Sequence, residues 1–206
     1  MFNGLLQDIK YFKLDMVYDN RILIITIDRP PVNAFVAENY IEMERIMDFV
    51  VHSQEICAVI LQANGKMFSA GADVKRLGTD TAEDAAKRRA YLRKSGEVMH
   101  NCPVPLIVAA HGPALGVGLV YVTCGDIVIA AENAVFSLPE IDVFVVGGAA
   151  NLSKFLPRQK VKTLALTGGK INAQEAYRLG AVEKVVPIED LRSTALEYAQ
   201  ICAECG

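Results

Sequence analysis

Short runs of β-branched and aliphatic residues recur along the chain and predict buried strands. The run RILIITID at residues 21–28 ends just before Pro30 and Pro31, a pattern typical of a strand followed by a turn. Similar runs predict further extended segments at residues 57–62, 105–110, 127–131, 135–138 and 182–187.

Helical patterns lie between these strands. Apolar residues at helical spacing predict a helix at 33–51, and the charged stretch 79–100 predicts a surface helix. The segment 112–124 opens with glycines before an apolar run, which predicts a strand, a tight turn and a buried helix. Helices are also predicted from residue 147 onward, at 173–179 with Gly180 as the stop, and at 188–205.

These elements follow a repeated β-β-α order, so we expect an α/β domain of stacked turns. No low-complexity segment indicates a linker, and a single domain is expected over residues 1–206.

Composition excludes several classes of function. Hydrophobic residues make up 52% of the chain and charged residues 22%, which excludes disorder as the main feature. The net charge of -3 provides no global basic field for a nucleic acid or an anionic membrane, and we expect neither as a partner. The chain contains no run of roughly 18 apolar residues and no signal-peptide pattern, so we expect a soluble, cytoplasmic protein.

The cysteines predict a reducing compartment and no metal site. Their number is odd and their spacing is not that of a disulfide scaffold. Cys202 and Cys205 form a C-x-x-C pair, but no second pair or nearby histidine completes a zinc site. The five positions are Cys57, Cys102, Cys124, Cys202 and Cys205.

Three segments become informative when they are taken together. They are MFSAGADVK at 67–75, HGPALGVGL at 111–119 and SLPEID at 137–142. Their order and spacing resemble the enoyl-CoA hydratase/isomerase (crotonase) family, as does LTGGKINAQEAYRLGAVEKVVP at 166–187. The resemblance covers nearly the whole chain. It implies a ClpP/crotonase-like spiral of β-β-α units whose C-terminal helical part, which in the family covers the CoA site and builds the trimer, is truncated after Gly206.

The small residues of these segments suit an oxyanion site. A thioester carbonyl that becomes an enolate needs hydrogen-bond donors already aimed at its oxygen, and two backbone N–H groups can provide them. Residues 70–72 leave a loop unobstructed, and residues 116–118 begin a helix whose first amides lack partners. The resemblance implies that the amides of Ala72 and Val117 are the donors. Val117 replaces the glycine usual in the family, and a requirement for positive φ there would count against it.

The resemblance also implies a groove that binds an acyl-CoA thioester, with CoA as part of the substrate and no separate cofactor. Lys75 and Arg76 are either a solvated pair or phosphate contacts. Asp73 is expected to hold its own loop, and His111 to pack near a strand end rather than act as a base. The expected groove residues are Ala70, Gly71, Asp73, Val74, Lys75, Leu77, Gly116, Val120 and Phe144.

One catalytic carboxylate of the hydratase pattern is missing. Family hydratases use two glutamates around one water, so that one takes a proton while the other gives one. Glu140 matches the second glutamate, and the first falls on Val120. A single acid/base beside an oxyanion site is sufficient for a 1,3 proton shift, and hydration would need help from Tyr121 or Asp142. We therefore expect an enoyl-CoA hydratase or a Δ3-Δ2 enoyl-CoA isomerase, with the pKa of Glu140 raised by burial.

Further departures leave alternatives open. The aspartate of dienoyl-CoA isomerases would fall on Gly148, which disfavours that branch. Phe144 and Val145 replace glycine-type residues and either narrow the acyl pocket or vary a buried wall. A non-catalytic acyl-CoA binding or scaffold protein is the main alternative. A ClpP-like protease would need a serine at 117–121, where there is none. The family implies a homotrimer or a dimer of trimers.

Overall fold

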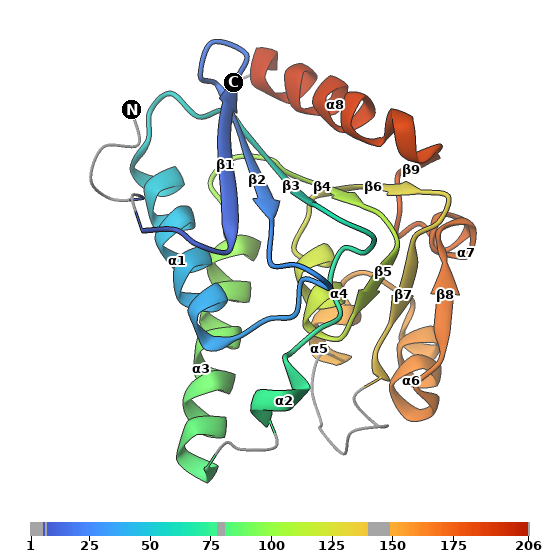
Figure 1. The fold of residues 1–206 in the computed structure, drawn as a ribbon. Helices are drawn as coiled ribbons and strands as arrows, with labels where there is room; N and C mark the ends of the chain where they lie inside the picture. The colour runs from blue at the N-terminus through green and yellow to red at the C-terminus, as the bar shows by residue number, and fades with distance from the viewer. Residues whose placement is uncertain (1–5, 7, 78–80, 140–148, 206) are drawn as a thin grey trace.

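The fold comes from a computed structural model, which describes residues 6, 8–77, 81–139 and 149–205 (Figure 1). A six-stranded sheet has the order β1-β2-β3-β4-β6-β9, and a three-stranded sheet has the order β5-β7-β8. The strands are β1 Phe12–Val17, β2 Ile22–Ile27, β3 Ala58–Ala63, β4 Leu106–Ala110, β5 Pro113–Leu115, β6 Ile127–Ala131, β7 Val135–Ser137, β8 Lys170–Asn172 and β9 Lys184–Val186.

Helices connect these strands and cover the large sheet. The helices are α1 Ala37–His52, α2 Val74–Leu77, α3 Ala82–His100, α4 Val117–Val122, α5 Ala149–Leu152, α6 Arg158–Thr167, α7 Ala173–Arg178, the 3-10 turn η2 Ile188–Asp190, and α8 Leu191–Cys205. The helix expected from residue 79 begins at Ala82, because Thr81 and Asp84 exchange hydrogen bonds in a capping box. Gly180, with φ 75°, follows α7 as the expected stop.

The apolar strand runs reflect a sheet that is buried on both faces. β2 is parallel to β3, and β3, β4, β6 and β9 continue in the same direction. Ile24 of β2 packs in the core under α8, whereas Leu23 and Ile25 pack in the core on the opposite face. A parallel strand buried on both faces needs a continuous apolar run rather than an alternating one, and RILIITID has that pattern.

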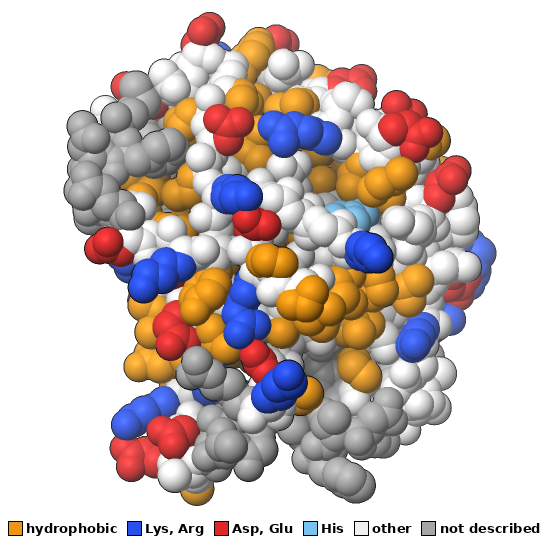
Figure 2. Space-filling view, in the orientation of Figure 1, with side chains coloured by type: hydrophobic (Ala, Val, Ile, Leu, Met, Phe, Trp, Pro, Cys, Tyr) orange, Lys and Arg blue, Asp and Glu red, His pale blue; other side chains and the backbone are white. Residues whose placement is uncertain are grey.

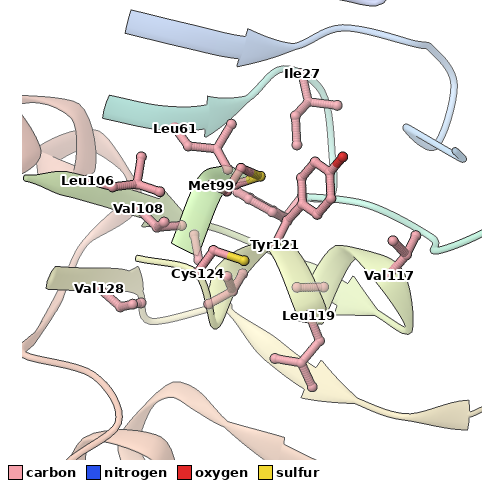
Figure 3. Close-up of a cluster of buried hydrophobic side chains, with 14 of the residues drawn as sticks. Ile27, Leu61, Met99, Leu106, Val108, Val117, Leu119, Tyr121, Cys124 and Val128 are labelled. Carbon is pink, nitrogen blue, oxygen red and sulfur yellow. The ribbon is translucent and has the colours of Figure 1, made fainter. Parts of the chain in front are cut away.

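The two cores, one on each face of the large sheet, differ in how closely their helices approach the strands. On one face, Ala195, Ala199 and Ala203 of α8 are fully buried at a spacing of four residues. These small side chains let the helix axis lie close to β3 and β4. On the other face, larger side chains from the sheet, α3 and α4 meet, including Met99, Leu119 and Tyr121 (Figure 3).

The spiral of repeated β-β-α units is confirmed. β4 leads into β5 and then α4, and β6 leads into β7 and then the helices that follow. The short strands of successive units pair in the small sheet, in which β5 is parallel to β7. Isolated parallel bridges continue this pairing from Ala114 to Ser69 and from Ala72 to Phe35.

Two strands were not predicted. β1 pairs antiparallel with β2 at the sheet edge, and its alternating FKLDMV was not interpreted as a strand. β8 has three residues and pairs antiparallel with β7. Three residues are too few for a periodic pattern, so this strand depends on its neighbour.

The described residues show mixed surface charge and free thiols. Positive and negative side chains are mixed on the face in Figure 2, and hydrophobic side chains gather near its centre. In the described ranges, no helix combines the length and apolarity needed to cross a bilayer, and no three His, Cys, Asp or Glu side chains are grouped to hold a metal ion. The described cysteines Cys57, Cys102, Cys124 and Cys202 are free thiols.

Candidate active site

The loop at residues 69–73 lies directly against the start of α4. Ser69 donates its amide to the Pro113 carbonyl at 3.1 Å and accepts from the Leu115 amide at 2.9 Å. A β-carbon added at Gly71 would lie 2.9 Å from the Leu115 carbonyl oxygen, and Gly71 has φ +87°. Both the close approach and the backbone angle therefore require glycine at this position.

The other side of this loop is bound to the segment that precedes α1. The Phe35 amide donates to the Gly71 carbonyl at 2.8 Å, and the Asp73 amide donates to the Phe35 carbonyl at 2.9 Å. A trans peptide is planar, with its C=O and N–H pointing in opposite directions. Because the Gly71 carbonyl points at Phe35, the Ala72 N–H of the same peptide points away from Phe35. Within the described parts of the chain, nothing accepts a hydrogen bond from it.

The first turn of α4 carries the second candidate donor. Gly116 is the N-cap residue, with φ 52° and ψ -118°, and its carbonyl accepts from the Val120 amide at 3.0 Å. Val117 is the first helical residue, so its amide has no intrahelical acceptor. The residues that the structure describes supply no other acceptor. The positive φ falls on Gly116 and not on Val117, so a β-branched residue is compatible with this helix start.

Comparison with known proteins gives a consistent result. Residues 18–205 match the family model described as Enoyl-CoA hydratase/isomerase. The chain belongs to the enoyl-CoA hydratase/isomerase family. Carnitinyl-CoA dehydratase from Escherichia coli (strain K12) is 36% identical to it over 191 residues, which is 91% of this chain and 73% of that protein.

Two further similarities support the family and its fold. The (7aS)-7a-methyl-1,5-dioxo-2,3,5,6,7,7a-hexahydro-1H-indene-carboxyl-CoA hydrolase of Rhodococcus jostii (strain RHA1) is 32% identical over 179 residues, covering 86% of this chain and 69% of that protein. A crystal structure of an enoyl-CoA hydratase from Bacillus anthracis superposes with a TM-score of 0.89 at 30% identity, covering 94% of this chain and 77% of that one. The curated relatives with these names are enzymes that process CoA thioesters.

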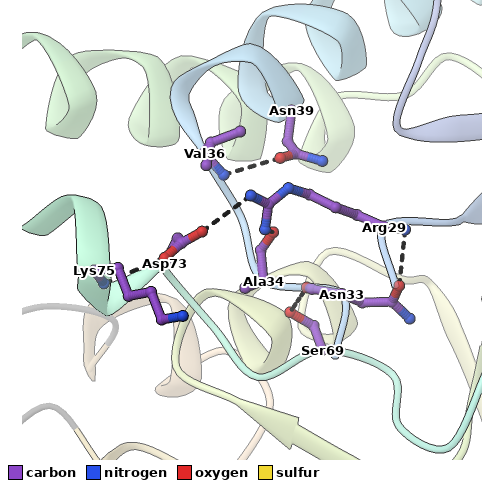
Figure 4. Close-up of polar contacts among 8 residues, drawn as sticks. All are labelled: Arg29, Asn33, Ala34, Val36, Asn39, Ser69, Asp73 and Lys75. Carbon is purple, nitrogen blue, oxygen red and sulfur yellow. Dashed lines mark hydrogen bonds and ion pairs between the residues drawn. The ribbon is translucent and has the colours of Figure 1, made fainter. Parts of the chain in front are cut away.

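Side-chain hydrogen bonds of Asn33 fix the turn before α1, and the Ser69 hydroxyl of the loop at residues 69–73 donates to the Asn33 carbonyl in this turn (Figure 4). The Asn33 side chain donates to the carbonyls of Asn64 and Met67, at 2.8 and 3.0 Å. Its Oδ1 accepts from the Arg29 amide at 2.9 Å. Asn33 is 3% exposed and has φ 52°, a conformation that asparagine tolerates better than most residues. Asn33 therefore links the turn before α1 to both sides of the turn after β3.

Asp73 has the expected structural role in its loop. Its Oδ2 lies 3.0 Å from Nη2 of Arg29, and its Oδ1 accepts from the Lys75 amide at 3.2 Å. Arg29 also donates from Nη1 to the Ala34 carbonyl at 2.8 Å. The ion pair therefore connects the loop at residues 69–73 to the segment before α1, and the Asp73 carboxylate binds Arg29 and the Lys75 amide.

The first two residues that follow the loop, which were expected to line a groove, are exposed to solvent. Val74 is 59% exposed, and the Lys75 side chain is also exposed. No carboxylate among the described residues pairs with Lys75. Ala70 is half-buried, with its amide bonded to the Val32 carbonyl at 2.9 Å, and the backbone of Leu77 ends α2.

The described surroundings of the first turn of α4 are apolar. Val117 and Val120 are 5% and 4% exposed, and α4 is buried along its whole length. Val120, which the resemblance places at the position of the first hydratase glutamate, has an aliphatic side chain that cannot transfer a proton. Glu140, Asp142, Phe144, Val145 and Gly148 lie outside the described residues, and the structure does not place them.

Two other candidates have structural positions. The Tyr121 hydroxyl donates to Ser95 Oγ at 3.1 Å, and its ring contacts Phe35 edge-on at 4.8 Å, so Tyr121 is directed at α3 and the core. Burial raises the Tyr121 pKa well above its usual value. The His111 ring Nε2 lies 2.9 Å from the Gly65 carbonyl, and the side chain packs at the end of β4 as expected.

The sequence did not identify Arg29, Asn33 and Ser69 as parts of this site. Ser69 was within the MFSAGADVK motif, but the motif alone assigns no partner to its hydroxyl. Asn33 and Arg29 follow a strand in a polar turn, which is a common place for such residues. Each of them also contacts a partner 31 to 44 residues away in the chain, and local pattern could not reveal these contacts.

Proposed function

We propose that this protein binds an acyl-CoA thioester and stabilises the enolate-type anion formed from it with the amides of Ala72 and Val117. The main support is that two adjacent segments each present an N–H group for which the described residues supply no acceptor. Two N–H donors fixed beside each other can accept developing charge on a carbonyl oxygen without reorganising. Membership of the family and the CoA thioesters in the relatives' names support the substrate class.

Glu140 is the proposed acid/base. Its position in the Pro139-Glu140-Ile141 motif supports this role, and no second carboxylate is available at Val120. With one carboxylate, the simplest reaction removes a proton at C2 of a 3-enoyl-CoA and returns it at C4. The proposed activity is therefore Δ3-Δ2 enoyl-CoA isomerase or enoyl-CoA hydratase, with no metal and no cofactor beyond the CoA of the substrate.

A second candidate is acyl-CoA binding without turnover. The buried valine at position 120 favours it, because the apolar wall lacks the first glutamate of the hydratase pattern. In both cases we propose a cytoplasmic protein, and a homotrimer or a dimer of trimers as the family implies.

Steady-state assays with crotonyl-CoA and a 3-enoyl-CoA, on the wild type and Glu140→Gln, test the proposal. We expect turnover of at least one substrate, lowered about 100- to 10,000-fold by the substitution, as for the loss of a general acid/base. Calorimetry with the same thioesters should give similar dissociation constants for both proteins. Equal activity of the two proteins removes Glu140 from the mechanism.

Binding without turnover supports the second candidate. If neither thioester binds, both candidates are wrong.

A further inference from the structure

Ser69 occupies the contact between the two segments that carry the candidate donors. Its side chain is fully buried. The hydroxyl donates to the Asn33 carbonyl at 2.7 Å and accepts from the Gly71 amide at 3.1 Å, so both kinds of hydrogen bond are used. This single atom therefore joins the turn before α1 to the loop that carries the Ala72 amide.

The Gly71 bond bears directly on the direction of the Ala72 amide. Gly71 has φ +87° and lacks a side chain, so its backbone has more freedom to rotate than any other residue type would have. Ser69 holds the N–H on one side of Gly71, and the Phe35 amide holds the carbonyl on the other side at 2.8 Å. The first bond lies on the Ala70–Gly71 peptide and the second on the Gly71–Ala72 peptide, so together they restrain rotation at Gly71 and with it the direction of the Ala72 N–H. Without the Ser69 hydroxyl, one of these two restraints is lost.

The β-carbon of Ser69 also determines how closely the loop approaches α4. A β-carbon added at Gly118 would lie 2.7 Å from Ser69 Cβ and 3.1 Å from its Oγ. Such a contact is too short, so Gly118 lets α4 approach Ser69 as closely as it does. The first turn of α4, including Val117, therefore rests against the same side chain that holds the Gly71 peptide.

We propose that Ser69 is a positioning residue for the oxyanion site: its hydroxyl orients the Ala72 amide, and its contact with Gly118 sets the distance of that amide from α4. This inference rests on the proposed function. Nothing in it requires Ser69 to touch the substrate.

Two substitutions separate the two roles of this side chain. Ser69→Ala removes both hydrogen bonds and keeps the β-carbon, whereas Gly118→Ala keeps the hydroxyl and forces the loop and α4 apart. Ser95→Ala is the control for the first, because Ser95 is also fully buried and has two side-chain hydrogen bonds, to Leu92 and from Tyr121. Gly96→Ala is the control for the second, because an added β-carbon there meets nothing within 4 Å.

The decisive measurement is the infrared stretch of a bound thioester carbonyl. Butyryl-CoA labelled with carbon-13 at that carbonyl is a saturated probe that cannot be hydrated. In the wild type, we expect binding to shift the stretch to lower wavenumber, because two donors polarise the carbonyl. Ser69→Ala and Gly118→Ala should lose most of this shift while the dissociation constant for butyryl-CoA changes little. Ser69→Cys should lie between Ser69→Ala and the wild type, and both controls should match the wild type.

Turnover provides a second readout on any substrate that the wild type converts. We expect kcat to fall about 10- to 100-fold in Ser69→Ala with KM nearly unchanged, as for a small misplacement of a catalytic group. A role in stability alone would lower the melting temperature and leave both the carbonyl stretch and kcat per folded molecule as in the wild type.

The outcomes distinguish this inference from the proposed function. If the wild type shows the shift and Ser69→Ala keeps it, the positioning role is wrong and the proposed oxyanion site stands. If the wild type binds butyryl-CoA without a shift, or does not bind it, the proposed site is wrong and this inference falls with it.

Hydrogen exchange on the wild type needs no variant and decides the matter if the variants do not fold. The Gly71 amide should be protected with or without butyryl-CoA, and those of Ala72 and Val117 only with it. Fast exchange of the Gly71 amide would overturn the inference.

Discussion

The loop at residues 69–73 and the first turn of α4 lie side by side, but different interactions hold them. In addition to its backbone bonds, the loop has a hydrogen bond from the Ser69 hydroxyl to the Asn33 carbonyl and an ion pair between Asp73 and Arg29. Among the residues that the structure describes, the first turn of α4 is held by backbone bonds, from the Gly116 amide to the Ser137 carbonyl at 3.0 Å and from the Val120 amide to the Gly116 carbonyl, together with complete burial.

The difference indicates how each donor tolerates change. A donor held by burial and helix geometry accepts a different side chain, which agrees with valine at position 117 in place of glycine. A donor held by polar side chains depends on each of them, because every broken bond leaves a buried group unpaired. On α4, we therefore expect a substitution to impair the donor mainly when it removes the amide itself. On the loop, substitutions of polar residues away from Ala72 should also impair the donor.

Among changes in these two segments, the largest effect is expected from Val117→Pro. Proline has no N–H but is compatible with the first position of a helix, so the change removes the donor at a site where the helix tolerates it. We expect kcat on the substrate found for the wild type to fall about 100- to 1000-fold, the cost of one oxyanion donor. Val117→Ala keeps the amide and is the matched control. Equal rates for the two variants would show that this amide is not a donor.

Asn33→Ala should have the largest effect on the stability of the loop. It removes one accepted and two donated hydrogen bonds and places alanine at a positive φ. We expect the free energy of unfolding to fall by about 3 kcal/mol, at roughly 1 kcal/mol for each bond. Asn33→Gly tolerates the backbone angle and should be more stable than Asn33→Ala by about 1 kcal/mol. Urea denaturation measures both, and no difference between them would contradict the contribution of the backbone angle.

The Arg29–Asp73 ion pair should contribute less. The two side chains are 25% and 18% exposed, so solvent screens the pair only in part. A double-mutant cycle with Arg29→Ala and Asp73→Asn should give a coupling of about 1 kcal/mol that decreases as salt is added. A coupling near zero at low salt would leave Asn33 and Ser69 as the main links of the loop.

The smallest expected effect concerns the reactivity of the Cys124 thiol, which lies just after α4. Burial raises the pKa of the Cys124 thiol to about 12, so it stays protonated at ordinary pH. Because the thiolate is the reactive form, iodoacetamide at pH 8 should label the more accessible Cys57 but not Cys124. Labelling of Cys124 should increase only as the pH rises toward 12 or the protein unfolds. Peptide mapping by mass spectrometry reports each site, and early labelling of Cys124 would show that this region opens readily.

The family, the β-β-α order and most strands could be predicted from the sequence. Continuous apolar runs such as residues 21–28 identify strands buried on both faces, because most side chains of a strand covered on both sides must be apolar. The motifs at 67–75 and 111–119 predicted two loops of small residues, and glycine at 71 and 116 is needed where the chain adopts positive φ. These features follow from the local chemistry of a few neighbouring residues.

Only the tertiary structure decided how the two loops meet and what holds them. The Ser69 hydroxyl donates to a carbonyl 36 residues away and the Asn33 side chain to one 31 residues away, and these contacts depend on how β2, β3 and β4 pair. The short strand β8 and the edge strand β1 likewise depend on the strands beside them. A chain pattern encodes which residues are buried, whereas the direction of a single amide is set by contacts that exist only after the sheet has formed.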